Sequence, residues 1–396
     1  MSDHVTVNTA SSLRFNLGKL FILQALAFAW FPIPTIILFY QSYGLSLEQA
    51  LILKTVLSLS TLVCEIPSGY LADLCGRKSS LVAGGAIWTI SLLLYCFGGS
   101  FSVFLAAEML AGVAASLISG ADTALAFDTL LRQGREGEYP RFEGRMVAIA
   151  GVTEAVCGVV GGVVAANNLV YPFYLQAACI ALYCLLAATL TEPPRHISQR
   201  IKIWPVVRSA FSEPRLKWLI FFSATLSTAT FLIVWLSQAY LEGQNFPVAS
   251  FGLAWALFHG VMSLAAIGAT VTTLRLGAQR SFFLLVILLG LSYILLGFIR
   301  QPWGIVFIAT VYGVRGLKTP LLLSYINRHA MSESRATVLS VNSFVFRLGF
   351  AVAGPVAGYL ADTYSLDITL MVFGTIFLTL GIFCADKLTF LQVFSD

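Results

Sequence analysis

The chain has 396 residues, of which 58% are hydrophobic and only 11% are charged, and its mean hydropathy is +0.84. An ordinary soluble domain carries about 25% charged residues, so 24 Lys and Arg and 19 Asp and Glu cannot cover a water-facing surface of this size. Most of the surface is therefore expected to face lipid. This excludes a soluble enzyme, a nucleic-acid-binding module and a disordered scaffold.

Twelve apolar stretches follow one another along the chain, each near or above the roughly 20 residues needed to cross a ~30 Å hydrocarbon core. They predict helices over 16–40, 47–70, 79–98, 101–127, 143–166, 170–190, 217–240, 249–273, 281–299, 303–326, 336–361 and 367–388. The runs lack the inside/outside alternation of barrel strands. The sequence therefore predicts an all-α membrane protein with twelve transmembrane helices.

Basic residues gather in alternate connections between these helices. Most of the 24 Lys and Arg lie on the side where the chain begins and ends, and Arg300 alone lies in the connections of the opposite side. By the positive-inside rule, both termini are expected in the cytoplasm, with the chain in the inner (cytoplasmic) membrane. The net charge of +5 then reflects insertion and indicates no nucleic-acid partner.

The longest polar break lies near mid-chain and divides the helices into two sets of six. It is basic and proline-rich, reading TEPPRHISQRIKIWPVVRSAFSEP over 191–214. We predict an N-terminal bundle over 1–190, a cytoplasmic linker over 191–216 and a C-terminal bundle over 217–396, related by internal duplication. Part of the linker, 201–211, is expected to lie in the membrane interface as a helix.

Signals for cofactors and processing are weak. The first helix is too long for a signal-peptide core, so it is expected to be retained. The seven cysteines are scattered without metal-binding pairs, the four histidines lack metal spacing, and the phosphate loop GxxxxGK[ST] does not occur. We expect free thiols, no metal and no cofactor, with a proton gradient as the energy source.

The most specific signal lies between the second and third predicted helices, where residues 65–81 read EIPSGYLADLCGRKSSL. Gly69 permits close helix contact, and Gly76 turns the loop. Asp73 is placed to cap the next helix or to pair with Arg77.

This segment resembles the loop signature of the major facilitator superfamily, G-x-L-a-D-r-x-G-R-[K/R]-x-x-L. The matching positions are Gly69, Leu71, Asp73, Gly76, Arg77, Lys78 and Leu81, and Leu74 stands where the family usually has a basic residue. The resemblance implies the family's fold, two pseudo-symmetric six-helix bundles, and secondary transport. It also implies a conformational latch at this loop that holds the outward-facing state, helped by an acidic residue near the end of helix 4. Asp122 or Asp128 is the candidate for that residue.

Further stretches resemble a poorly characterised bacterial branch of this superfamily. They are 119–122 with Asp128, 143–145, 325–328 and 335–340. Two departures separate the chain from proton-coupled drug exporters. Glu108 precedes Gly112 where exporters have the arginine of R-x-x-x-G, and 157–162 lacks the proline of G-P-x-x-G-G, while an intact GPVAG occurs at 354–358. The departures weaken a drug-antiporter assignment.

The pentapeptide GYLAD occurs twice, at 69–73 and at 358–362. The first copy is predicted to end a helix at the cytoplasm and the second to end one outside. Because the two copies lie at opposite faces, we interpret the match as coincidental.

Ionisable residues inside a membrane are costly, so each is a functional candidate. Acidic candidates dominate the first half: Glu154 near mid-depth in helix 5 and Glu108 in the outer half of helix 4 are the proton-coupling candidates, with His259 in helix 8. Arg315 and Arg347, near mid-depth in helices 10 and 11, and Lys318, one turn from Arg315, are the substrate-binding candidates. Structural ion pairs are an equally weighted alternative for the two arginines. Lys54 is expected to snorkel outward and Glu65 to be structural.

Three further side chains, Trp30, Gln238 and Trp255, are candidates for lining a cavity for a partly apolar ligand. Packing against lipid or within the interface belt explains most aromatic residues in such proteins. These three therefore remain candidates beside that simpler interpretation.

Taken together, the sequence predicts a monomeric secondary transporter, not an enzyme, that moves a small organic solute by alternating access and is driven by protons. The polarised charges favour an anionic or amphipathic solute. Import and export both remain open. The alternatives are a flippase for lipids or lipid-linked precursors, a proton-driven multidrug exporter, and a transport-inactive sensor.

Overall fold

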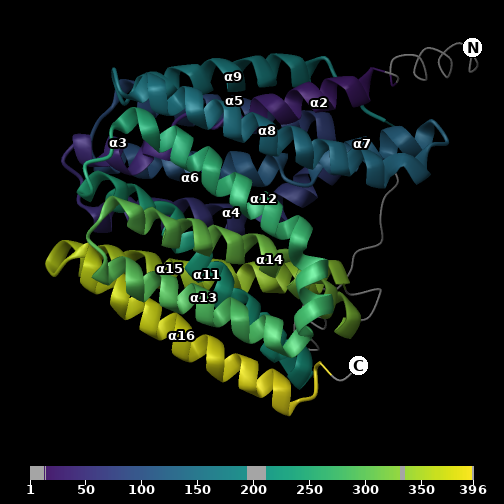
Figure 1. The fold of residues 1–396 in the computed structure, drawn as a ribbon. Coiled ribbons are helices and arrows are strands. Elements are labelled where there is room, and N and C mark those ends of the chain that lie inside the picture. The colour runs from purple at the N-terminus through teal and green to yellow at the C-terminus, as the bar shows by residue number, and fades with distance from the viewer. Residues whose placement is uncertain (1–12, 14, 194–210, 331–334, 395–396) are drawn as a thin grey trace, which may run out of the picture. The chain divides into compact units, whose positions relative to one another are not determined.

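The computed structural model describes residues 13, 15–193, 211–330 and 335–394. These residues are almost entirely helical, with no β-strand among them (Figure 1). The predicted all-α membrane fold is therefore confirmed. Most of the predicted interfacial helix over 201–211 lies outside the described residues.

The helices agree with the twelve predicted stretches, apart from ends that differ by a few residues and two interruptions. In chain order they are α2 (Asn16–Ala27), η1 (Ile33–Thr35), α3 (Ile36–Ser42), α4 (Leu47–Cys75), α5 (Arg77–Phe97), α6 (Phe101–Ile118), α7 (Ala121–Arg132), η2 (Glu136–Glu138), α8 (Tyr139–Ala165), α9 (Tyr171–Ala188), α11 (Pro214–Gly243), α12 (Val248–Leu276), α13 (Ala278–Phe298), η3 (Pro302–Gly304), α14 (Ile305–His329), α15 (Arg335–Thr363) and α16 (Leu366–Phe390). Within the described chain, eleven helical stretches are long and apolar enough to span a membrane.

The first predicted helix, 16–40, is wrong as a continuous element. The structure has two shorter apolar helices there, Asn16–Ala27 and Ile33–Ser42. Pro32 and Pro34 explain the interruption, because proline removes a backbone donor and clashes with the preceding turn. Turn hydrogen bonds, such as that from the Trp30 amide to the Phe28 carbonyl (2.8 Å), satisfy part of the backbone at the break.

The fourth predicted helix, 101–127, is also interrupted, between α6 and α7. Gly120, directly before α7, has φ +81, a conformation that glycine adopts without steric cost. The Ser119 amide donates to the Ala115 carbonyl (2.9 Å) and the Ala124 amide to the Gly120 carbonyl (3.0 Å), so both helix ends are partly satisfied. Because of the break, Asp122 lies in the first turn of a new helix.

The second predicted helix is longer than expected, because α4 continues through the GYLAD segment to Cys75 and contains Pro67. The turn is then confined to Gly76, whose φ of +106 lies in the region that favours glycine. Helix α5 begins at the next residue, Arg77. The two basic residues of the signature are therefore the first residues of a helix.

The described chain divides into two compact units that are not the two sequence halves. Unit 1 takes in Met1–Phe39, Val56–Gln199 and Val248–Ala256, and unit 2 takes in Tyr40–Thr55, Arg200–Pro247 and Leu257–Asp396. The start of α4 thus belongs with unit 2, and the start of α12 with unit 1. The two predicted six-helix halves remain a prediction.

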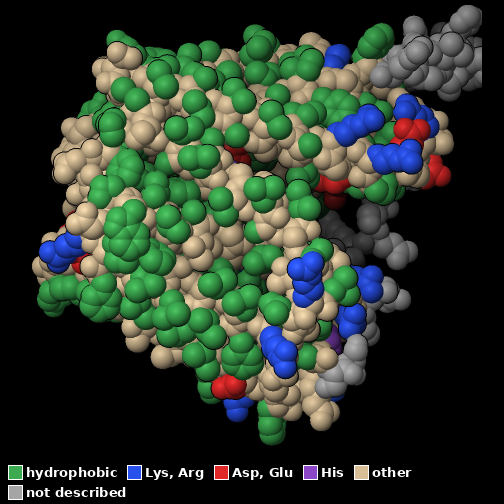
Figure 2. Space-filling model, in the orientation of Figure 1, with side chains coloured by type: hydrophobic (Ala, Val, Ile, Leu, Met, Phe, Trp, Pro, Cys, Tyr) green, Lys and Arg blue, Asp and Glu red, His purple; other side chains and the backbone are tan. Residues whose placement is uncertain are grey.

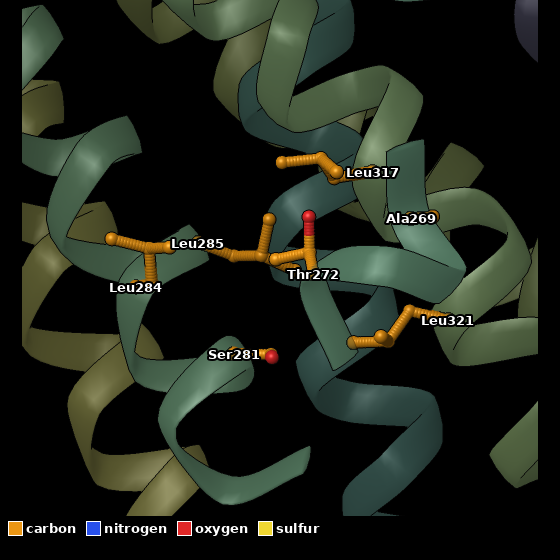
Figure 3. Close-up of a pocket in the computed structure, with 7 residues that line it drawn as sticks. All are labelled: Ala269, Thr272, Ser281, Leu284, Leu285, Leu317 and Leu321. Atoms are coloured by element: carbon orange, nitrogen blue, oxygen red, sulfur yellow. The ribbon is translucent and has the colours of Figure 1, made fainter. Parts of the chain in front are cut away.

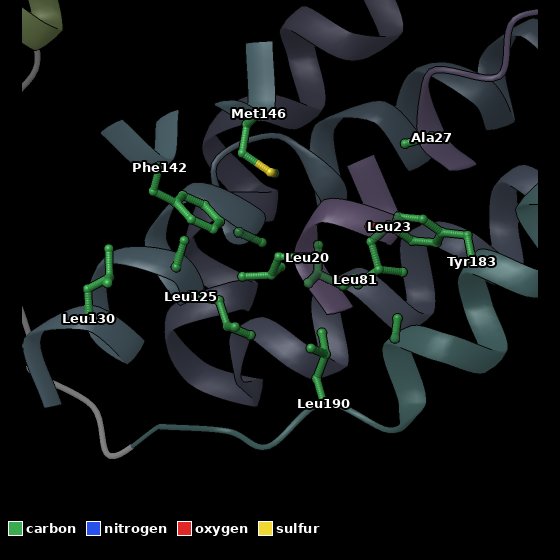
Figure 4. Close-up of a cluster of buried hydrophobic side chains, with 13 residues drawn as sticks. Leu20, Leu23, Ala27, Leu81, Leu125, Leu130, Phe142, Met146, Tyr183 and Leu190 are labelled. Carbon is green, nitrogen blue, oxygen red and sulfur yellow. The ribbon is translucent and has the colours of Figure 1, made fainter. Parts of the chain in front are cut away.

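A hydrophobic core in unit 1 joins α2, α5, α7, α8 and α9 (Figure 4). Its buried side chains include Leu20 and Leu23 from α2, Leu81 from α5 and Leu125 from α7. The ring of Phe21 stacks on Phe142 of α8, with centroids 4.8 Å apart. This packing fixes the starts of α5, α7 and α8 relative to one another, and those starts carry the polar residues described below.

Unit 2 is built around α11. In the most apolar stretch of this helix, 78% of the residues are buried. The Tyr293 hydroxyl of α13 donates to the Ala229 carbonyl of α11 (2.6 Å), and Phe222 stacks on Phe282 with centroids 5.0 Å apart. Polar side chains on α11 are therefore shielded from lipid.

The outer surfaces of the spanning helices are apolar, as a lipid-facing protein requires. Figure 2 shows hydrophobic side chains over most of the visible face. On α12, for example, Leu264 is 72% exposed and Ile267 is 79% exposed. The expectation drawn from composition, that the surface faces lipid, agrees with this distribution.

Close helix packing in unit 2 predicts a site that tolerates no side chain. A Cβ on Gly374 of α16 would lie 2.8 Å from Ile294 Cγ1 and from Tyr293 Cβ of α13, whereas a Cβ on Gly268 of α12 would meet nothing within 4 Å. Gly374→Leu should therefore lower stability by about 1–3 kcal/mol through overpacking, and Gly268→Leu should not. The melting temperatures of the two detergent-solubilised variants test this. Equal losses would contradict the packing.

Candidate functional site

The latch predicted at the 65–81 signature has a defined geometry in unit 1. Arg77 Nη1 forms an ion pair with the Asp128 carboxylate and donates to the Ala124 carbonyl (2.6 Å). Asp128 is 7% exposed. Of the two acidic candidates, Asp128 is thus the one that contacts Arg77 and links the start of α5 to α7.

A residue that sequence reasoning missed completes this cluster. Glu192 accepts hydrogen bonds from the backbone amides of Arg77 and Lys78, each at 2.8 Å. These amides are unsatisfied donors at the start of α5, where the helix dipole also favours negative charge. The available signal in the sequence was that Glu192 follows the sixth predicted helix, whose end is expected on the same side of the membrane as the 65–81 loop.

The two roles predicted for Asp73 stay predictions, and the structure places this residue near the end of α4. The start of α5 is capped by Glu192, and the carboxylate bound by Arg77 is that of Asp128. Because α4 continues to Cys75, Asp73 lies on a helix rather than in a loop, and its side chain is exposed. The latch residues Gly69 and Lys78 stay assigned by resemblance alone.

The three proton-coupling candidates lie in different environments. Glu108 on α6 is 1% exposed, and Glu154 on α8 is half-buried; both belong to unit 1. His259 on α12 lies in unit 2 and meets the Tyr312 ring edge-on, with centroids 5.3 Å apart. Of the three side chains, that of Glu108 is the most completely buried.

The substrate-binding candidates of unit 2 include one well-defined contact. Lys318 on α14 is 8% exposed, and its ammonium donates to the Ser227 hydroxyl of α11 at 2.6 Å. Arg315, one turn earlier, lies close enough to act on Lys318 electrostatically. Gln238 on α11 is 2% exposed, and Arg347 on α15 is half-buried.

The two tryptophan candidates belong to unit 1. Trp30 stacks on Phe28, with centroids 5.0 Å apart. Trp255 is 6% exposed and lies beside Gly158, where an added Cβ would come within 2.9 Å of Trp255 Cδ1. Both rings are therefore packed against neighbouring residues within the unit.

Lys54 does not snorkel outward, so that prediction is wrong. Its side chain is 3% exposed, and Nζ lies 5.2 Å from the Tyr40 ring centroid and 5.1 Å from the Trp235 ring centroid. Aromatic faces attract a buried cation electrostatically. A lysine in an apolar helix was the available signal, but its aromatic partners come from other elements.

The glycines at 157–162 keep their packing role although the proline of the exporter motif is absent. A Cβ on Gly162 would lie 2.6 Å from the Gly252 amide nitrogen, so α8 and the start of α12 approach backbone to backbone. Gly158 and Gly162 have the small-xxx-small spacing that permits such contacts in membranes.

The second GYLAD copy has a contact of its own in unit 2. The Asp362 carboxylate accepts hydrogen bonds from the amides of Leu47 (3.1 Å) and Glu48 (2.7 Å). It therefore caps the start of α4 in the same way as Glu192 caps α5. The two copies end different helices and make different contacts.

One small cavity in unit 2 is lined mainly by apolar side chains (Figure 3). It measures about 10 Å³ and lies between α12, α13 and α14. Its two hydroxyls are used by their own helices: Thr272 donates to the Gly268 carbonyl and Ser281 to the Gly277 carbonyl. We interpret it as a packing gap.

The sequence matches the family model of the Major Facilitator Superfamily over residues 20–354. The chain belongs to this superfamily. The resemblance recognised at the 65–81 signature is thereby confirmed, and the chain is a member of a family of membrane transporters.

Among curated proteins, the chain is 23% identical over 367 residues to the uncharacterized MFS-type transporter YxaM of Bacillus subtilis (strain 168), covering 88% of this chain and 90% of that protein. It is 24% identical over 183 residues to the quinolone resistance protein NorA of Staphylococcus aureus (strain MRSA252), covering 46% and 45% of the two chains.

Solved structures share the fold at low sequence identity. The nucleoside transporter NupG has a TM-score of 0.79 at 14% identity, covering 95% of this chain and 98% of that one. A POT family transporter in complex with 5-aminolevulinic acid has a TM-score of 0.68 at 14% identity, covering 93% and 94%. These likenesses concern the fold.

The latch geometry predicts which acidic residue is energetically coupled to Arg77. Arg77→Gln and Asp128→Asn should each lower stability by about 1–3 kcal/mol, because each leaves a partly buried charge unpaired. The double variant should lose clearly less than both losses combined, whereas Arg77→Gln with Asp122→Asn should be additive within about 0.5 kcal/mol. Unfolding of the purified variants measures both cycles. Coupling to Asp122 instead of Asp128 would contradict the assignment.

The buried Lys318 ammonium predicts an asymmetric response. Ser227→Ala removes its hydroxyl partner and should cost about 1–3 kcal/mol, whereas adding Lys318→Met should recover most of that loss, because removing both polar partners costs little. Thermal unfolding of the unmodified protein and of these two variants is the measurement. If Ser227→Ala alone has no effect, the hydrogen bond contributes nothing to stability.

Proposed function

We propose that the chain is a secondary active transporter that moves a small organic, anionic or amphipathic solute across the membrane by alternating access, coupled to protons. It is proposed to act as a monomer in the cytoplasmic membrane, with both termini in the cytoplasm. The observation that supports the proposal concerns the charged residues that lie away from the helix ends. Their charge has one sign in unit 1 and the opposite sign in unit 2.

The deep ionisable residues of unit 2 in the described chain are basic. They are Lys54, His259, Arg315, Lys318 and Arg347, whereas the described acidic residues of this unit lie near helix ends. A set of cations in a low-dielectric region attracts an anionic group strongly. Arginine adds a planar fork that matches a carboxylate or phosphate. These residues support binding of an anionic group by unit 2.

Unit 1 contributes the opposite sign at depth. Glu108 and Glu154 lie well inside α6 and α8, and Glu108 is almost completely buried. A carboxylate held inside a membrane gains from binding a proton, which removes the cost of burying its charge. The two residues are therefore proposed to carry protons during transport, with His259 as a further candidate.

A second candidate function is export of amphipathic drugs, which the partial match to NorA favours. The chain departs from the exporter pattern at Glu108 and lacks the proline at 157–162. Lipid flipping has no comparable observation in its favour. Drug export gives an outcome distinct from the main proposal in the experiment below.

Purified protein in proteoliposomes with a trapped pH-sensitive dye tests the proposal. The probes are nucleosides, dipeptides, small carboxylates and quinolones, each added outside under an imposed pH gradient. We expect one anionic or zwitterionic class to change proton flux across the membrane. Arg315→Gln and Arg347→Gln should lower that flux at least tenfold, and Glu154→Gln or Glu108→Gln should abolish its dependence on the gradient.

Arg300→Gln is the matched control, because Arg300 is exposed and pairs with Asp367 at a helix end (2.8 Å). It should transport like the unmodified protein. A response to quinolones alone would favour drug export. Proton coupling would be refuted if solute flux through the unmodified protein did not depend on the pH gradient and Glu154→Gln did not change that flux.

A further inference from the structure

The turn between α12 and α13 in unit 2 carries two arginines that the transport proposal does not use. Arg275 lies in the last turn of α12, and Arg280 lies in the first turn of α13. Both side chains are exposed, and neither forms an ion pair within the described residues. Basic residues at such a turn are expected from the positive-inside rule, so a ligand for them has to be argued from their surroundings.

The helices that meet at this turn contain no carboxylate. Between Glu242 and Glu333 the sequence has no Asp or Glu, and this segment includes all of α12, α13 and α14. The last turns of α12 and α14 and the start of α13 gather around the small gap shown in Figure 3. Arg328, exposed in the last turn of α14, adds a third cation to this end of the three helices.

A neighbouring helix, α16, does not neutralise this charge. A Cβ on Gly381 of α16 would lie 2.7 Å from Val286 Cγ1 of α13, so the last turns of α16 lie beside the first turns of α13. Asp386 is the acidic residue at this end of α16. It is exposed, forms no ion pair within the described residues, and is followed directly by Lys387. The surplus of positive charge around the turn therefore remains.

A groove on the outer side of α13 begins at this turn, and we call it the α13 groove. It measures about 490 Å³, within the roughly 300–1,000 Å³ of ligand sites in proteins. It is lined by Leu276 of α12 and by Gln279, Arg280, Phe283, Leu284 and Ile287 of α13. The α13 residues recur at intervals of three and four, so they share one face of the helix over about 12 Å. A polar entrance is thus followed by an apolar floor.

The chemistry of the α13 groove matches an anionic phospholipid. Leu274 is 81% exposed and Ile287 is 42% exposed, and such side chains face the hydrocarbon of the bilayer, so the floor is accessible to an acyl chain. The guanidinium groups of Arg275 and Arg280 have the planar fork that suits a phosphate. Basic pockets between transmembrane helices are a known mode of recognition for anionic headgroups.

Two other sources of phosphate fit the groove less well. A free phosphate would leave the apolar floor without a partner. A zwitterionic phospholipid would bring an ammonium group next to several cations, which repel it. The surroundings therefore favour a lipid over a soluble anion and an anionic headgroup over a zwitterionic one.

We propose that the α13 groove binds one anionic phospholipid, with Arg275 and Arg280 holding the headgroup phosphate and an acyl chain lying along the apolar face of α13. The lipid covers the turn between α12 and α13 from the outside. The site uses none of the residues proposed to bind solute or protons, so it stands or falls independently of the proposed function.

Native mass spectrometry of the purified full chain tests the site, with phosphatidylglycerol and phosphatidylethanolamine of identical acyl chains as the probes. We expect the first phosphatidylglycerol to bind at least tenfold more tightly than phosphatidylethanolamine. Arg280→Gln should weaken its binding about fivefold, and Arg275→Gln combined with Arg280→Gln about 25-fold, because each basic residue near a membrane surface contributes about 1 kcal/mol.

Arg135→Gln is the matched control for charge. It removes the same charge from an exposed arginine that already pairs with Glu138 (2.8 Å), so phosphatidylglycerol binding should not change. Equal affinities of the unmodified protein for the two lipids would overturn the proposal. So would losses of the same size in Arg135→Gln and Arg280→Gln, because binding would then follow net charge alone.

Ile287→Trp tests the apolar floor. The larger side chain should fill part of the groove and weaken phosphatidylglycerol binding at least threefold, without lowering the melting temperature in the absence of lipid, because Ile287 is partly exposed. Leu264→Trp, at a 72% exposed residue of α12 outside the groove, is the matched control and should bind the lipid normally. Unchanged binding in Ile287→Trp, or displacement of the lipid by millimolar glycerol phosphate, would overturn the acyl-chain site.

Discussion

A bilayer core offers no hydrogen-bond partners to a polypeptide backbone, so every amide and carbonyl within it must be satisfied by the chain itself. This constraint explains the long apolar helices, the scarcity of charge and the exposed leucines and isoleucines of helices such as α12. It also makes each departure from helix informative. The break before η1 and the break at Gly120 are tolerated for two reasons. Turn hydrogen bonds to nearby carbonyls satisfy part of the freed backbone, and proline and glycine favour the backbone conformations of the turns.

The same constraint makes the starts of helices into binding sites for carboxylates. Unsatisfied amides at a helix start attract negative charge, and several carboxylates of the described chain lie at such starts. Glu192 caps α5, Asp362 caps α4, and Asp122 lies in the first turn of α7. The first two hold helices to distant segments.

Cations removed from water also need partners within the protein, because an anion, a dipole or an aromatic face must replace the lost hydration. Arg77 finds the Asp128 carboxylate, Lys318 finds the Ser227 hydroxyl, and Lys54 lies between two aromatic rings. These partners stabilise the ions in place, and exchanging them during a cycle is the kind of change that transport requires. In the proposed function, the basic residues of unit 2 bind the solute and the acidic residues of unit 1 bind the proton.

The sequence by itself determined the lipid environment, the helices and the family. The length of an apolar stretch and a local signature are both properties of consecutive residues. The all-α fold and the superfamily were predictable from runs of about 20 apolar residues and from residues 65–81. Only the tertiary structure decided that Asp128 rather than Asp122 meets Arg77, that Glu192 caps α5, and that Lys54 is enclosed by aromatic rings. Those partners come from other elements, in the latch cluster from up to 115 residues away along the chain, and helix packing alone brings them within hydrogen-bond or ring-contact distance.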